Sequence, residues 1–185
     1  SVAIIDWDVH HGNGTQDIFY DRGDVFYTSL HEHGLYPGTG DLTEIGDGDG
    51  AGTNLNVPLP PGSGDEEYIA SLDQLVKPAL RAFDPDVVLV SVGFDAHRHD
   101  PISRMHVSTE GYGVMAERVR EYADMAGAGI AFVLEGGYDL DTLADGVCMV
   151  HEVFEGWDPV ESDGQINESV LNLIEEILLA HQGFG

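Results

Sequence analysis

Basic residues are scarce in this sequence. Lysine and arginine number 7 together, against 34 aspartates and glutamates, so the formal net charge is −27. A surface of that sign repels phosphate backbones and anionic lipid headgroups, so we expect neither nucleic acid nor a membrane as a direct partner, and cationic substrates are favoured. The acidic residues occur along the whole chain, as in a folded protein with an acidic shell. This charge predicts a halophilic archaeon as the source, because concentrated salt screens repulsion between like charges.

Cysteine and long apolar runs are also rare or missing. Cys148 is the single cysteine, which excludes an internal disulfide, and its neighbours Val147 and Met149 predict that it packs in a core. No apolar run approaches the roughly 20 residues that a membrane-spanning helix needs, and no signal peptide is evident, so we expect a cytoplasmic protein. The chain begins at Ser1 and enters a predicted strand at once, so we expect that an amino-terminal part of the protein precedes it.

The hydrophobic pattern predicts an α/β fold in a single domain over residues 1–185. Strands that alternate with helices are typical of a three-layer structure, a mostly parallel sheet with helices on both faces. Pro78 should kink the helix that carries it, and the glycine-rich residues 31–64 are predicted to form a long loop. The predicted strands are 2–6, 25–30, 87–92 and 130–134, and the predicted helices are 65–83, one starting near Ser108 or Thr109, 139–154 and 168–180.

Asp6, Asp8 and His10 follow the first apolar run at alternate positions. Side chains of a strand repeat their direction every two residues, so these three share one face. Carboxylate oxygen and imidazole nitrogen are donors that Zn²⁺ accepts, and one strand could deliver two of them to one ion. The alternative is a polar strand end, with His10 hydrogen-bonded inside a core.

Polar motifs also follow the other predicted strands. Asp95 leaves a buried strand and could supply a third ligand, which would keep one coordination position open, as in catalytic zinc sites. The alternative is that Asp95 caps a turn. The segment Glu135-Gly136-Gly137-Tyr138 could bring its backbone close to a ligand and a hydroxyl to an oxyanion. Ligands of parallel sheets bind beyond the carboxyl ends of the strands, so we expect these motifs at one rim, with His97 and His99 serving loop structure.

In this order, three segments closely resemble the histone deacetylase family, in particular its class II branch: Asp6-Trp7-Asp8-Val9-His10-His11-Gly12-Asn13-Gly14, Gly93-Phe94-Asp95-Ala96 and Leu134-Glu135-Gly136-Gly137-Tyr138. The resemblance implies an arginase/deacetylase-like fold, truncated at its amino-terminal side so that a sheet edge is exposed. It implies a zinc-dependent amidohydrolase that removes acetyl groups from an acetylated protein lysine or an acetylated polyamine. Asp8, His10 and Asp95 would hold one Zn²⁺, and the Tyr138 hydroxyl would polarise the acetyl carbonyl.

The resemblance also implies a structural K⁺ ion beside the zinc and a substrate channel. The cation would be held by side-chain or backbone oxygens of Asp6, Asp8, His10, Ser29 and Leu30. The channel residues would be Tyr36, Pro37, Ile102, Gly136 and Gly137.

The chain departs from the family at the general acid and base. The family places these roles on a His-His pair upstream of the zinc-ligand strand, outside these 185 residues. His10 and His11 are adjacent, but His10 is the matched ligand and His11 would point to the opposite face of the strand. We therefore expect the full-length protein to be a deacetylase and this fragment alone to be inactive.

Two other functions fit parts of the pattern. An arginase-like ureohydrolase with two manganese ions would share the fold, but His99 stands where its second carboxylate should be. A non-catalytic, metal-stabilised interaction module would keep the scaffold without the base, yet it would not need the Tyr138 hydroxyl.

We predict that the protein unfolds when salt is removed. At about 1 M salt the screening length falls to about 3 Å, which mutes repulsion among the acidic side chains, and dilute buffer restores that repulsion. Circular dichroism across a salt titration measures the change. Equal stability in dilute buffer and in concentrated salt would contradict the prediction.

Overall fold

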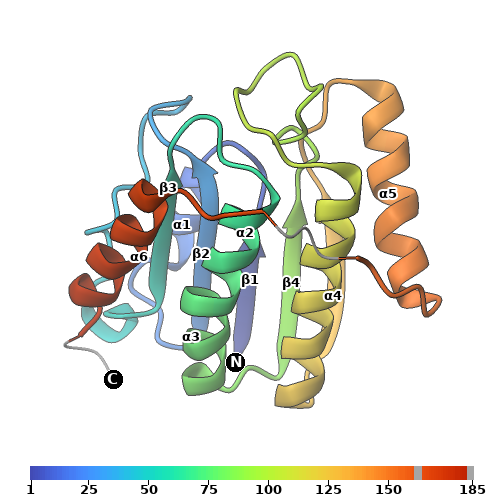
Figure 1. Ribbon diagram of the computed structural model, residues 1–185. Helices are drawn as coiled ribbons and strands as arrows, with labels where there is room; N and C mark the ends of the chain where they lie inside the picture. The colour runs from blue at the N-terminus through green and yellow to red at the C-terminus, as the bar shows by residue number, and fades with distance from the viewer. Residues whose placement is uncertain (161–163, 183–185) are drawn as a thin grey trace.

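The computed structural model describes residues 1–160 and 164–182. Its centre is a five-stranded parallel sheet in the order β3-β2-β1-β4-β5, so β1 occupies the middle (Figure 1). This arrangement confirms the predicted parallel α/β sheet. The strands are β1 (Val2–Asp6), β2 (Val25–Glu32), β3 (Asn54–Leu59), β4 (Val87–Val92) and β5 (Gly129–Leu134).

Helices pack on both faces of the sheet, as predicted. In Figure 1, α2, α3 and α4 lie in front of the sheet and α1 lies behind it, while α6 stands beside β3 and α5 beside α4. The helices are α1 (Asn13–Phe19), α2 (Asp65–Ser71), α3 (Lys77–Phe83), α4 (Thr109–Ala126), α5 (Leu140–Phe154) and α6 (Glu168–Ala180).

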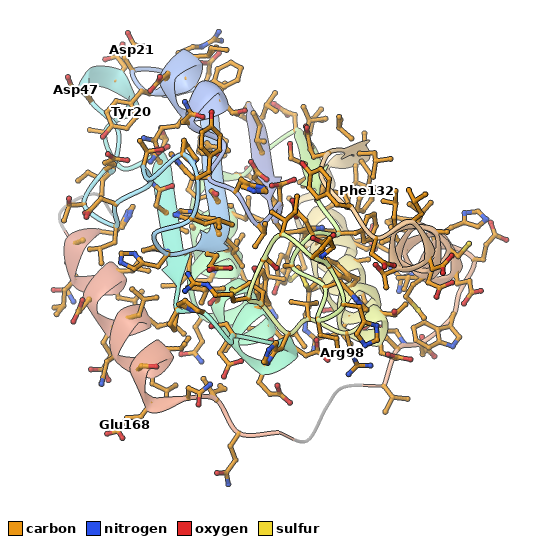
Figure 2. All side chains as sticks on the ribbon, turned by 90° about the horizontal axis from the view of Figure 1, so that it is seen from above. Tyr20, Asp21, Asp47, Arg98, Phe132 and Glu168 are labelled. Carbon is orange, nitrogen blue, oxygen red and sulfur yellow. The ribbon has the colours of Figure 1, made fainter. Side chains whose placement is uncertain are left out.

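Alternation along the strands divides the apolar side chains between these two faces. Ile5 of β1 and Val90 of β4 are fully buried in the larger cluster under α2 to α4. Ile4, one residue earlier in β1, belongs to a smaller cluster with Phe19 of α1. At the sheet edge, Phe132 of β5 lies next to α5 (Figure 2), and its ring centroid is 5.3 Å from that of Phe154.

The four predicted strands are confirmed, but the prediction of a loop over residues 31–64 was wrong, because β3 lies within it. In β3, apolar residues alternate with Asn54, Asn56 and Pro58. Proline is tolerated because, among the described residues, β3 is an edge strand that pairs with β2 alone. The asparagines are buried, and both donate to Gln16 of α1, at 3.0 and 2.8 Å. The sequence interpretation did not include α1 either.

The other edge strand, β5, is largely exposed. Val133 and Leu134 are 51% and 56% exposed, because β5 pairs with β4 alone within the described residues. Cys148 is exposed too, and the prediction that it packs in a core was wrong. It lies on α5, which stands at this edge and buries a single stripe that includes Thr142, Gly146 and Val153.

The predicted helices are present with local differences. The helix expected over residues 65–83 runs as α2, a π-helical turn (Leu72–Val76) and α3, with Pro78 in the first turn of α3. Ser108 caps α4, since its Oγ accepts the Gly111 amide at 2.9 Å. In the described part of the chain, each helix is too short or too polar to cross a bilayer.

We predict that Gly146 of α5 cannot be replaced without loss of stability. A Cβ atom there would lie 2.3 Å from a ring atom of Phe94, and overpacking of this kind costs about 1–3 kcal/mol. Gly14 of α1 is the matched control, because a Cβ atom there would meet no heavy atom within 4 Å. Gly14→Ala should be neutral or stabilise by up to about 1 kcal/mol. Urea unfolding measures both; equal changes in the free energy of unfolding would contradict the prediction.

Candidate metal centre

Asp8, His10 and Asp95 meet where β1 and β4 end. His10 Nδ1 lies 3.0 Å from Asp8 Oδ1 and 3.1 Å from Asp95 Oδ2. One ligand atom from each residue lies within 4.8 Å of the others, and no second group of three or more possible ligands occurs in the described residues. The register explains this meeting: Asp6 at the end of β1 pairs with Ser91 of β4, so both chains leave the sheet at the same level.

The electrostatics of this cluster favour a positive charge. Hydrogen bonds to Asp8 and Asp95 raise the pKa of His10 to about 10, although partial burial opposes the rise. Burial opposes ionisation of Asp8 as well, but hydrogen bonds from His10 and from the Gly136 amide outweigh it and lower the pKa of Asp8. The pKa of Asp95 is raised, because burial and the nearby Asp8 both disfavour its charged form.

The donor set fits a divalent metal ion. Asp95 is fully buried; its Oδ1 accepts the Val9 amide at 2.9 Å, and its Oδ2 faces the His10 ring, whose Nδ1 lies 3.1 Å away. Two carboxylates and one imidazole are ligands that a zinc-type ion accepts, with a fourth position left for another molecule. A divalent ion among them would give both carboxylates a positive partner, which their burial favours.

A glycine allows the backbone to approach these carboxylates closely. A Cβ atom at Gly136 would lie 2.1 Å from Asp95 Oδ2 and 2.5 Å from Asp8 Oδ2. Instead, the Gly136 amide donates to Asp8 Oδ2 at 2.8 Å. The turn after β5 therefore contacts the cluster of Asp8, His10 and Asp95 directly, as expected from the Gly-Gly-Tyr motif.

Tyr138 follows in the same turn. Its side chain is 53% exposed, and its pKa is raised by partial burial and by the negative charges of Asp95 and Asp8. A hydroxyl with a raised pKa keeps its proton and can donate a hydrogen bond to a developing negative charge.

The residues expected around K⁺ are also close together. Asp6 pairs with Ser29 in the register of β1 and β2. The Asp6 carboxylate is buried and accepts the Asp8 amide and the Tyr27 hydroxyl, each at 3.1 Å. Burial and repulsion from Asp8 raise the pKa of Asp6 well above its usual value. The Ser29 hydroxyl is bonded to His31 at 2.9 Å, and Leu30 is buried beside it. Cation binding by this set stays a prediction.

The remaining predicted residues lie on loops at the same edge of the sheet, which Figure 2 shows from above. Tyr36 and Ile102 are exposed on the loops after β2 and β4, so their role in a channel stays a prediction. His97 is buried, and its ring is bonded to the Thr109 hydroxyl and to the His99 amide, which confirms a role in loop structure.

Sequence reasoning missed the polar contacts that hold these loops. His11 turns away from the cluster, as predicted, and its ring is bonded to Thr39 at 2.7 Å and to Gln16 at 3.0 Å. The fully buried Glu32 carboxylate accepts the Arg104 amide at 2.9 Å and Nε at 2.7 Å, which ties the loop after β4 to the end of β2. Asp100 is buried, and its carboxylate accepts the Tyr138 amide at 2.7 Å.

Comparison with known proteins gives consistent matches. The histone deacetylase domain matches residues 1–154. Histone deacetylase 10, chloroplastic, of Oryza sativa subsp. japonica is 46% identical over 156 residues, which are 84% of this chain and 35% of the relative. The histone deacetylase-like amidohydrolase of Pseudomonas aeruginosa is 46% identical over 139 residues, 74% of this chain and 37% of the relative. A probable deacetylase of Archaeoglobus fulgidus is 43% identical over 141 residues, 76% of this chain and 39% of the relative.

Solved structures agree with these matches. The histone deacetylase Clr3 superposes with a TM-score of 0.93 at 34% identity, over 100% of this chain and 32% of Clr3. The HD domain of HDA15 superposes with a TM-score of 0.90 at 38% identity, over 100% of this chain and 51% of that one. This chain therefore spans well under two thirds of the proteins it matches.

We predict that the chain binds one divalent metal ion at Asp8, His10 and Asp95. His10→Gln removes the nitrogen ligand and should weaken Zn²⁺ or Co²⁺ binding by about tenfold or more. His97→Gln is the matched control, since His97 is a buried histidine outside the cluster. Calorimetric titration of both variants with either ion measures the affinities, and equal affinities would contradict the assignment.

Proposed function

Since the chain belongs to the histone deacetylase family, we propose that it is the carboxyl-terminal part of a deacetylase catalytic domain. The first relatives described above are more than twice as long as the matched segment, so the activity proposed is that of the longer protein. The reaction is hydrolysis of an acetylated amine, which yields acetate and a free amine. The observation that carries the proposal is the cluster of Asp8, His10 and Asp95 beside the turn that bears Tyr138.

In this proposal, Asp8, His10 and Asp95 hold one Zn²⁺ ion. When bound, the ion supplies Lewis-acid polarisation of the amide carbonyl and lowers the pKa of water. Tyr138 donates its hydroxyl proton in a hydrogen bond to the carbonyl oxygen as negative charge develops there. Asp6 and Ser29, with the backbones beside them, hold K⁺ next to the zinc site. Tyr36, Pro37, Ile102, Gly136 and Gly137 line the path of the acetylated side chain.

A general base must take the proton from water, and an acid must protonate the leaving amine. His10 is a proposed ligand, and both ring nitrogens of His11 are engaged by Thr39 and Gln16. The resemblance to the family implies that a His-His pair outside these 185 residues has both roles, so we expect the chain alone to be inactive.

The substrate that fits best is a cationic molecule with an acetylated amine, either a protein lysine or a polyamine. The net charge of −27 attracts such a molecule. A binuclear arginase-like reaction finds less support, because the described residues contain a single metal-ligand group and the Asp100 carboxylate is engaged by backbone amides.

We predict that Tyr138→Phe lowers kcat by about 10²-fold or more, since it removes one oxyanion donor. The assay is hydrolysis of an acetyl-lysine peptide in concentrated salt by a protein extended with its upstream segment. Bound zinc should be unchanged, because Tyr138 is not among the ligands.

Tyr20→Phe is the matched control. Tyr20 lies at the end of α1, and Figure 2 shows it at the margin of the molecule beside Asp21 and Asp47. Its variant should keep the activity of the parent protein. A zinc-loaded extended protein that hydrolyses neither acetyl-lysine peptide nor acetylated polyamine would contradict the proposed function.

A further inference from the structure

The Asp100 carboxylate joins two loops at the rim of the sheet. It belongs to the loop after β4 and is only 6% exposed. Its Oδ2 accepts the Tyr138 amide at 2.7 Å and the Asp139 amide at 3.3 Å. Its Oδ1 accepts the Ile102 amide at 3.0 Å within its own loop. One side chain thus ties the turn after β5 to the loop after β4.

The turn that carries Tyr138 is held on both sides of this residue. Upstream, the Gly136 amide donates to Asp8 Oδ2 at 2.8 Å, and the Gly136 carbonyl accepts the Phe94 amide at 2.8 Å. Gly137 follows with φ of 141°, a conformation that residues with a side chain rarely adopt. Downstream, the hydrogen bonds to Asp100 are the contacts that anchor the Tyr138 and Asp139 amides.

The position of the Tyr138 side chain therefore depends on its backbone. The side chain is 53% exposed, and none of the described residues shares a hydrogen bond with its hydroxyl. A hydroxyl without a partner of its own is aimed by the main chain that carries it. A misplacement of about 1 Å in such a group can cost as much as about 10²-fold in rate.

We propose that Asp100 is a positioning residue that fixes the Tyr138 hydroxyl for the reaction. The inference rests on the proposed function, because it assigns Asp100 an effect through Tyr138 and not through the metal ligands. An aspartate suits the task since a carboxylate is an acceptor-only group, and three amides converge on it.

Asp65 provides a matched control. Its carboxylate also fixes a loop, since it accepts the Ser108 amide at 2.7 Å and the Ser108 hydroxyl at 2.6 Å. Those bonds tie the start of α2 to the start of α4 and leave the turn of Tyr138 untouched. Asp65→Asn should therefore lower the free energy of unfolding but keep kcat.

The test is a double-mutant cycle in the extended, zinc-loaded protein, with Asp100→Ala, Asp100→Asn, Tyr138→Phe and the combined variants. Asp100→Ala should lower kcat by about tenfold or more, with KM within about twofold, because an interaction of the transition state is lost. Asp100→Asn keeps one accepting oxygen, so it should lose less. In the Tyr138→Phe background, Asp100→Ala should change kcat by less than about twofold, since the hydroxyl that it positions is gone.

Amide hydrogen exchange adds a readout that does not depend on activity. Exchange at Tyr138 and Asp139 should speed up in Asp100→Ala and stay unchanged in Asp65→Asn. An active parent protein whose Asp100 variants keep kcat, or lose the same factor with and without the Tyr138 hydroxyl, would overturn the role of Asp100 alone. A zinc-loaded parent protein without deacetylase activity would overturn the proposed function and this inference together.

Discussion

The buried carboxylate of Asp95 is the constraint on which the rest of the site depends. One of its oxygens accepts the Val9 amide, and the other lies 3.1 Å from His10 Nδ1. A buried carboxylate is costly to ionise unless a positive charge lies beside it, so this oxygen favours a cation or a protonated imidazole as its neighbour. The Asp8 carboxylate is a second acidic group beside the same His10 ring, with its Oδ1 3.0 Å from His10 Nδ1. A proton on His10 neutralises one of the two carboxylates, whereas a divalent ion would neutralise both.

The sheet and its loops bring this cluster together from distant parts of the chain. The register between β1 and β4 places Asp8 and Asp95 side by side. The Asp95 carboxylate also accepts the backbone amide of Val9, which lies 86 positions earlier in the sequence. Backbone amides then orient the carboxylates, as the Gly136 amide does for Asp8. Asp100 makes a similar contact two residues later in the same turn, where its carboxylate accepts the Tyr138 amide. Asp8, a proposed metal ligand, and Tyr138 are thus both tied to the turn after β5 in the same way, by an aspartate that accepts a backbone amide of that turn.

Local patterns were sufficient to predict four of the five strands and to indicate Asp6, Asp8, His10 and Asp95 as possible ligands, because alternation is a property of a few adjacent residues. The choice of Asp8, His10 and Asp95 among them came from the resemblance to the histone deacetylase family. Contacts between distant residues were not predictable in this way. Asn54 can be buried in β3 because its side-chain Nδ2 donates to Gln16, which lies 38 positions earlier in the sequence. Asp100 is held by a hydrogen bond from the Tyr138 amide, 38 positions later in the sequence. Cys148 is exposed because of the way α5 packs at the sheet edge, and its apolar neighbours in the sequence do not predict that packing.

X-ray absorption at the zinc edge tests the central claim most directly. The account predicts one zinc ion per chain with nitrogen and oxygen neighbours at about 2.0–2.2 Å, a single imidazole among them and no sulfur. A second metal at about 3.5–4 Å, as in binuclear sites, would contradict it. A sulfur neighbour at about 2.3 Å would also contradict it, because that result would place the ion at Cys148 instead of at Asp8, His10 and Asp95.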